Sequence, residues 1–225
     1  MRSIALSFVL FTTVATHAQL GGRGSLGGGI GLSIPTGEFR DALGKNLFHV
    51  NAHMAYPLGR LPFLQGGLAF GYSVMGDNDR TVPVTTQYLG INEGTLTTRN
   101  KVFGYHALLR ISPLGVRIRP YADGLVGFRQ FRTTSKVTAD GVEGSLSKEA
   151  NQSDLAFSVG WAAGVMVTFG KLLYVEARVE RFNSGEATYA DPESVTISDQ
   201  GNVGFSRLTS RTDVTNVTAG IGLLF

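Results

Sequence analysis

The feature that most constrains this chain is an alternation of apolar and other residues with a period of two, which recurs eight times after Gly24. Such alternation predicts β-strands with two unlike faces, because successive side chains of a strand point to opposite sides of a sheet. The expected strands cover residues 25–34, 47–57, 64–75, 101–112, 116–131, 154–169, 172–182 and 212–225. An all-β fold follows.

The two faces of these strands differ in composition. Away from the loop ends of the strands, one face has no charged residue, and it carries eleven aromatic residues, Phe157 and Trp161 among them. The other face is rich in Gly, Ala and Ser and contains no Lys. The charged residues of this second face are Arg110, Arg117, Arg119, Asp123, Arg129, Asp154, Glu176, Arg178 and Glu180.

The size of an eight-stranded barrel decides which face points inward. A soluble barrel would bury the apolar face, whereas a membrane barrel turns it toward lipid. The interior of such a barrel is just wide enough to be filled by side chains. Eleven aromatic side chains are too bulky for that space, while small residues and a few long polar ones fit it. The sequence therefore predicts an eight-stranded antiparallel up-and-down transmembrane β-barrel.

The connections between the expected strands alternate between short and long. Short turns are expected at 57–62, 113–115 and 170–171. Long segments, rich in Thr, Ser, Asn, Asp and Gly, are expected as loops at 35–46, 76–100, 132–153 and 183–211. Membrane barrels have this arrangement, with short turns on the periplasmic side and longer loops outside.

The first residues have the pattern of a secretory signal peptide. Arg2 is followed by a short apolar run and then by small residues, which predicts a signal peptide over 1–18, cleaved between Ala18 and Gln19. Residues 19–225 are then one barrel domain. The chain has no Cys, which excludes disulfides and fits export to a bacterial envelope better than a disulfide-dependent secreted domain.

The complete pattern resembles the small outer-membrane β-barrels of Gram-negative bacteria. The segment 119–127 is similar to a strand of porin-like and OmpA-like barrels, and the C-terminal segment 217–225 is similar to their last strand. In that segment Ile221, Leu223 and Phe225 resemble the signal that the barrel-assembly machinery reads. The resemblance implies location in the outer membrane and that machinery as a partner during biogenesis.

The inward charges predict a closed interior. Isolated charges in a narrow lumen are very costly, so the Arg and carboxylate side chains are expected to pair as a salt-bridged plug. A narrow porin-like channel for small solutes is the alternative, although eight strands argue against a wide pore.

A set of basic residues has the lipid-facing parity at the loop ends of the strands. These residues are Arg99, Lys101, Arg132, Arg181 and Arg211. Long basic side chains at this level reach the headgroup region, where lipopolysaccharide carries phosphates that Arg binds with its fork of N–H groups. We expect a rim that contacts lipopolysaccharide.

The sequence predicts no catalytic residue, no cofactor and no metal site. His49 and His53 share a face but lie about 13 Å apart along a strand, and inward histidines suit hydrogen bonding in the interior. The expected function is that of a monomeric structural or surface-recognition protein, which meets an unknown extracellular partner through four extracellular loops. A lipid-modifying enzyme is a further alternative. The small positive charge is spread along the chain, so no nucleic acid partner is expected.

Overall fold

A computed structural model describes residues 24–86, 90–113, 115–139, 147–190, 196–197, 203–204 and 206–225 of the chain. The expected signal peptide at 1–18 lies outside the described residues. Within them, no helix has the length and apolar character needed to cross a bilayer.

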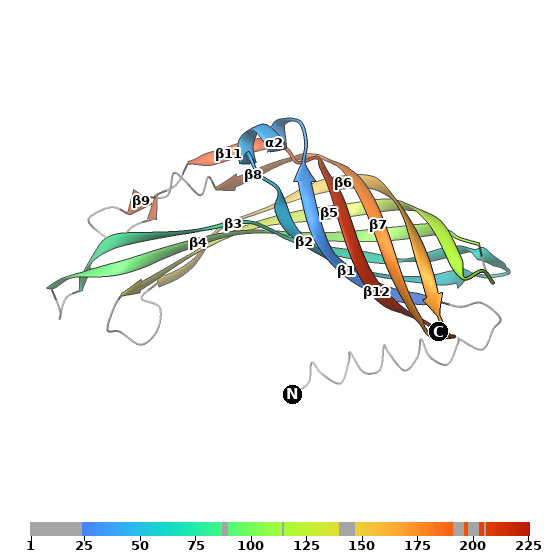
Figure 1. The fold of residues 1–225 in the computed structure, drawn as a ribbon. Coiled ribbons are helices and arrows are strands. Elements are labelled where there is room, and N and C mark those ends of the chain that lie inside the picture. Colours follow the sequence, from blue (N-terminus) through green and yellow to red (C-terminus); the bar gives the residue numbers. More distant parts are fainter. Residues whose placement is uncertain are drawn as a thin grey trace.

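Eight strands form a closed antiparallel barrel (Figure 1). They are β1 (Ser25–Pro35), β2 (Leu47–Leu58), β3 (Leu61–Thr86), β4 (Gly90–Ile111), β5 (Ile118–Ala139), β6 (Ser147–Phe169), β7 (Leu173–Ser184) and β12 (Val214–Leu224). Strands that follow one another around the wall pair in sequence order, and β12 closes the barrel by pairing with β1 from Ser25↔Leu224 to Pro35↔Val214. Every expected strand is present.

The alternation divides the strands between lipid and lumen as the sequence predicts. Trp161 and Phe157 on the outer face are each 53% exposed, and Ile221 is 70% exposed. On the inner face Arg110 and Arg178 are almost fully buried. The apolar residues therefore face outward and the charged residues face the lumen.

The short turns all lie at the end of the barrel where β1 begins and β12 ends (Figure 1). Each contains a glycine with a positive φ, namely Gly59, Gly115 or Gly170. Other residues are strained in this left-handed region, so glycine permits the chain to reverse within a few residues.

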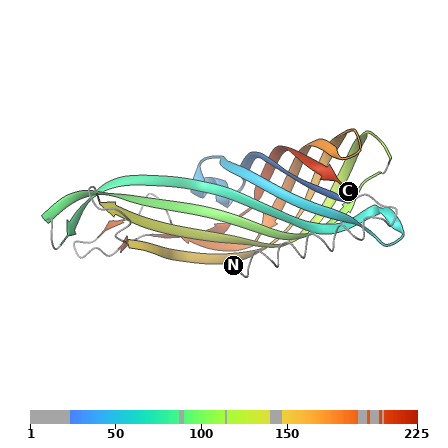
Figure 2. The ribbon, with the colours of Figure 1, turned by 90° about the horizontal axis from the view of Figure 1, so that it is seen from below.

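The long segments at the opposite end contain more regular structure than expected. The expected loops at 76–100 and 132–153 are largely extensions of β3, β4, β5 and β6, which project beyond the barrel wall in Figures 1 and 2. The pairing of β3 with β4 continues to Thr86↔Gly90. Apolar residues alternate along a strand only where one of its faces is covered by lipid or by a protein core. The alternation therefore ends with the barrel wall, although the strand pairing continues. Thr and Val in these segments favour strand structure.

A β-bulge marks the start of each extension. The register of β3 and β4 skips Met75 between Val74 and Gly76. The register of β5 and β6 skips one residue between Gln152 and Ala150. Bulges bend a strand and increase its twist, so they lie where the barrel wall gives way to a freestanding sheet.

The other two long segments also contain secondary structure. Helix α2 (Glu38–Leu43) lies between β1 and β2. Between β7 and β12, β8 (Glu186–Ala190) pairs with β11 (Arg207–Arg211), and β9 (Thr196–Ile197) pairs with β10 (Val203–Gly204). Strand β8 packs on β5 and β6. Helix α2, β8 and β11 lie at the mouth of the barrel, opposite the short turns, and β9 lies farther out (Figure 1).

Candidate functional site: the barrel lumen and its outer rim

A cluster of ion pairs occupies the lumen toward the short-turn end. Arg110 on β4 donates from Nε to Asp123 Oδ1 at 2.8 Å and from Nη2 to Oδ2 at 3.0 Å, a two-point contact with β5. Arg178 on β7 donates to the same carboxylate and, through Nε, to Glu180 Oε1 at 2.7 Å. The charged groups of this cluster are almost fully shielded from solvent, and their mutual hydrogen bonds offset the cost of burial.

Tyr121 links this cluster to a second carboxylate. Its ring lies 4.1 Å from the Arg110 guanidinium carbon, and its hydroxyl donates to Glu176 Oε2 at 3.2 Å while accepting from Arg178. His53 Nε2 on β2 lies 3.4 Å from the same Glu176 oxygen. Four strands are thereby connected across the lumen.

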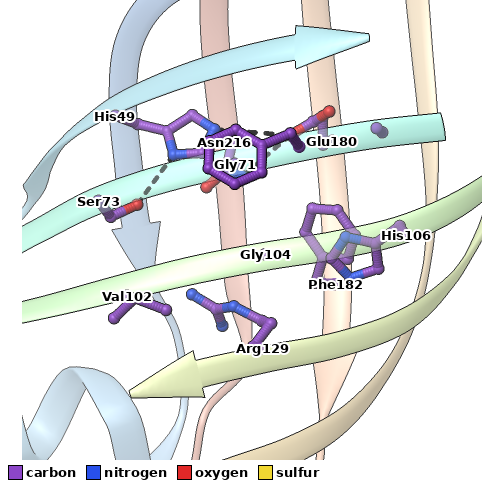
Figure 3. A pocket seen from close by; sticks show the side chains of 12 residues that line it. His49, Gly71, Ser73, Val102, Gly104, His106, Arg129, Glu180, Phe182 and Asn216 are labelled. Carbon is purple, nitrogen blue, oxygen red and sulfur yellow. Dashed lines mark hydrogen bonds and ion pairs between the residues drawn. The ribbon is translucent and has the colours of Figure 1, made fainter. Parts of the chain in front are cut away.

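A small cavity lies nearer the mouth (Figure 3). His49 Nδ1 is hydrogen-bonded to Ser73 Oγ at 2.8 Å, and its Nε2 lies 3.7 Å from Glu180 Oε2. Asn216 donates to this carboxylate at 3.0 Å. The cavity measures about 20 Å³, which suffices for a single water molecule. Gly71, another lining residue, leaves room for the imidazole of His49.

The other side of this cavity contains a second histidine. His106 Nε2 is hydrogen-bonded to Ser158 Oγ, and its ring lies 4.5 Å from that of Phe182. Serine, histidine and carboxylate are the residue types of a hydrolytic site, but these side chains are buried in a space that holds about one water. The arrangement therefore supports packing and hydrogen bonding across the lumen, with no room for a lipid substrate.

An apolar cluster covers the mouth of the barrel. Phe39 of α2 is fully buried and makes edge-to-face contacts with Phe131 and Tyr189, at centroid distances of 6.1 and 5.9 Å. Arg129 lies beneath, with its guanidinium carbon 5.5 Å from the Phe131 ring and a hydrogen bond to the Thr212 carbonyl. The helix thus places one aromatic side chain over the polar lumen.

The structure brings together most, but not all, of the charged residues expected inside. The cluster contains Arg110, Asp123, Glu176, Arg178 and Glu180. Arg119 is buried near the short turns, where its Nε donates to the Pro113 carbonyl at 3.1 Å. Arg129 lies near the mouth.

Two expected members of the inner face lie elsewhere. Arg117 is exposed, contrary to expectation, because β5 begins at Ile118, two residues later than expected, and leaves Arg117 in the turn. Asp154 is half-buried at the loop end of β6, where its oxygens accept hydrogen bonds from the backbone N–H groups of Leu155 and Thr188. Asp154 therefore links β8 to β6 through a hydrogen bond and is not part of the ion-pair cluster.

The expected rim residues do not form one ring. Lys101 on β4 lies opposite Arg132 on β5, and Arg99 lies two residues from Lys101 on the same face. On the other side of the barrel, Arg181 donates to the hydroxyls of Thr36 and Thr215 at 2.7 and 3.1 Å. Arg211 is exposed on β11, outside the barrel wall, and its backbone N–H donates to Glu38.

The residues that resemble an assembly signal lie on the outer face of the closing strand. Ile221 and Leu223 are exposed, and Phe225 exchanges two backbone hydrogen bonds with Gly24 at 2.7 and 3.0 Å. Among the described residues, no group of three or more His, Cys, Asp or Glu side chains is arranged to hold a metal ion.

Inspection of the sequence alone did not assign several residues that complete the site. Tyr121 and Asn216 have inward parity, which could have marked them as partners for the charges. Phe39 is a large apolar residue in a polar connection, which could have marked it as buried.

Comparison of the sequence with protein-family models gives no match, and neither does a search of the curated proteins. The structure resembles a major outer membrane protein from Thermus thermophilus, with a TM-score of 0.52 and 13% identity over 90% of this chain and 98% of that one. The likeness to Neisserial surface protein A has a TM-score of 0.49 and 12% identity, over 91% of this chain and 100% of that one. The likeness to the attachment invasion locus protein Ail of Yersinia pestis has a TM-score of 0.44 and 14% identity, over 92% of this chain and 100% of that one. The chain has the fold of the eight-stranded outer-membrane β-barrels.

Proposed function

We propose that this chain is exported to the outer membrane of a Gram-negative bacterium and acts there as a closed barrel, with a structural or surface-recognition role. The observation that carries the proposal is the contrast between the two ends of the molecule. At one end the strands are joined by turns of a few residues, and at the other four strands continue as a sheet beyond the wall. The additional structure at the loop end supports a role on that side of the membrane.

The closed lumen supports a non-enzymatic, non-conducting role. Ion pairs connect β4, β5 and β7 across the interior, and Phe39 covers the mouth. A solute path would require these charges to separate inside a low-dielectric wall, at considerable cost. An enzyme acting on lipid would need its Ser, His and carboxylate open to the membrane, whereas His49 and His106 are buried.

The sheet extension offers a surface for recognition. The pairing of β2 with β3 ends at Phe48↔Val74, so in the described part of the chain the backbone of β3 from Gly76 to Thr86 has no strand beside it on that side. Unpaired N–H and C=O groups of an edge strand accept an added strand from another chain. An extracellular polypeptide is therefore the partner class that we propose.

Surface labelling tests the proposed location and orientation. The chain has no Cys, so single-cysteine variants report one position each. Thr209→Cys lies on exposed β11 at the loop end, and Arg60→Cys lies in the exposed turn between β2 and β3. We expect a membrane-impermeant maleimide to label Thr209→Cys on intact cells, and to label Arg60→Cys only after the cells are broken. Equal labelling of both on intact cells, or of neither, contradicts the proposal.

A further inference from the structure

Two basic side chains stand directly opposite each other where the apolar band of β4 and β5 ends. Lys101 and Arg132 are paired in register, and both point outward. Their neighbours on the adjoining strands are Val74 on β3 and Ser153 on β6. Like charges directly opposite in a sheet are destabilising. Within the described part of the chain neither side chain has an acidic partner, so an anion between them would remove an otherwise unfavourable arrangement.

The other basic residues at this level are placed differently. Arg99 lies opposite Asp77 in register, so an acidic residue stands at the matching position. Arg181 already donates to two threonine hydroxyls. Arg211 lies opposite Glu186 in register. The pair Lys101 and Arg132 thus differs from the other rim residues, because each of these two cations has the other opposite it in register and neither has an acidic partner among the described residues.

An aromatic row leads from this pair down the lipid-facing wall. Lys101 Nζ lies 6.0 Å from the centroid of Tyr72, and Tyr72 lies 5.2 Å from Phe103. Phe103 lies 6.5 Å from Phe70, which in turn lies 5.3 Å from Tyr105. The row runs about 13 Å along the strands, from Lys101 to Tyr105, at about 3.3 Å per residue.

The row ends at an apolar groove across β2, β3, β4 and β5. Its floor contains Ala52 and Ala107, and its sides include Leu68, Phe70 and Phe128. The small alanine side chains between larger neighbours create a depression in the lipid-facing surface. A flexible hydrocarbon chain that reaches down from the level of Lys101 would fit along the row and fill it.

We propose that Lys101 and Arg132 bind a phosphate of a lipopolysaccharide molecule in the outer leaflet, one of whose acyl chains lies along the aromatic row and in the groove. Arg presents a fork of N–H donors that suits phosphate, and Lys adds a point charge. This site rests on the proposed outer-membrane location. It assigns lipopolysaccharide binding to two of the five expected rim residues and places one acyl chain along the aromatic row. A phosphorylated lipid can pair its phosphate with the two cations and fill the groove with an acyl chain, whereas a free phosphate can do only the first.

Titration of the folded barrel in detergent with the lipid anchor of lipopolysaccharide, read by native mass spectrometry, tests this site. Removing two charge-assisted contacts in the variant Lys101→Gln/Arg132→Gln is expected to weaken binding at least about tenfold. The matched control Arg60→Gln/Arg117→Gln removes two exposed cations at the short-turn end and is expected to bind like the unaltered protein. Ala107→Phe, which fills the groove, is expected to weaken binding several-fold.

Two further titrations separate the headgroup from the acyl chain. The same lipid without phosphates is expected to bind the unaltered protein as weakly as the phosphorylated lipid binds the double variant. Inorganic phosphate at equal concentration is expected not to displace the lipid. Equal binding by the double variant, equal binding of the dephosphorylated lipid, or full displacement by inorganic phosphate overturns the site. A protein that forms no β-structure in detergent contradicts the membrane barrel itself, which distinguishes the two failures.

Discussion

At the scale of single residues, large side chains on the inner face lie over glycines of nearby strands in the barrel wall. The ring of Tyr174 lies against Gly27 and Gly222. The ring of Tyr121 lies against Gly164 in the same way. A methyl group at any of these glycines would overlap the tyrosine, so each pair works as one unit of packing. The inward parity of these residues is readable from the sequence, but which tyrosine lies over which glycine depends on the register and tilt of the strands.

The most consequential single substitution in the lumen is Asp123→Ala. It leaves Arg110 without its carboxylate partner and Arg178 with Glu180 as its remaining carboxylate partner. Removing one partner of a buried ion pair typically costs about 3–5 kcal/mol, and we expect the free energy of unfolding to fall by that amount. Urea titration in lipid vesicles, followed by the fluorescence of the single Trp161, measures it.

The exposed carboxylate of α2 provides the control for that substitution. Asp41→Asn is exposed and is expected to change the free energy of unfolding by less than about 0.5 kcal/mol. If Asp123→Ala were as mild as Asp41→Asn, the ion pairs would not contribute to stability as described.

At the scale of strands and helices, the sequence predicts the wall of the barrel well and its extensions poorly. Within the wall, lipid on one side and packed lumen on the other impose strict alternation, so the membrane-spanning part of all eight strands was expected from the pattern. Beyond Val74 and Lys101 the apolar alternation stops while the pairing continues to Thr86↔Gly90, so the sequence pattern does not distinguish a paired strand from a loop there. Helix α2 is only six residues long, too short for a helical period to be visible.

The β3–β4 extension is expected to be separable from the barrel. Replacing residues 78–97 with a two-residue turn removes β3–β4 pairs beyond the Met75 bulge and the β4–β5 pairs from Gly94↔Ala139 to Thr97↔Lys136, and it leaves the wall from Val74↔Lys101 onward intact. Local units of a protein open independently when few contacts join them to the core. We therefore expect the free energy of unfolding to change by less than about 1 kcal/mol. A loss of several kcal/mol in the same urea titration would show that the extension is part of the folding unit.

At the scale of the whole molecule, two independent closures lie in series along the axis. One is the charge cluster around Asp123, and the other is the aromatic cover formed by Phe39 with Phe131 and Tyr189. The orientation of the whole barrel followed from the sequence because its two faces differ so strongly. The cover could not be predicted in the same way, because it depends on where a short connection folds back over the mouth.

Planar bilayer recordings test the closed lumen. We expect no steady single-channel current from the unaltered protein, because the ion pairs fill the narrow part of the barrel. Phe39→Ala opens the mouth alone, so it is expected to remain non-conducting. A stable unitary conductance from the unaltered protein would favour the narrow channel instead.

The pairing of β1 with β12 has a consequence for how the chain folds. Gly24 and Phe225 are hydrogen-bonded to each other, so the last seam of the wall joins opposite ends of the described polypeptide. Contacts of such large sequence separation form slowly, since most of the chain must be ordered before they can close. Until β1 and β12 pair, the backbone N–H and C=O groups along one side of each strand are free to pair with a strand of another chain. Speed of closure, more than final stability, would thus decide between a finished barrel and an aggregate.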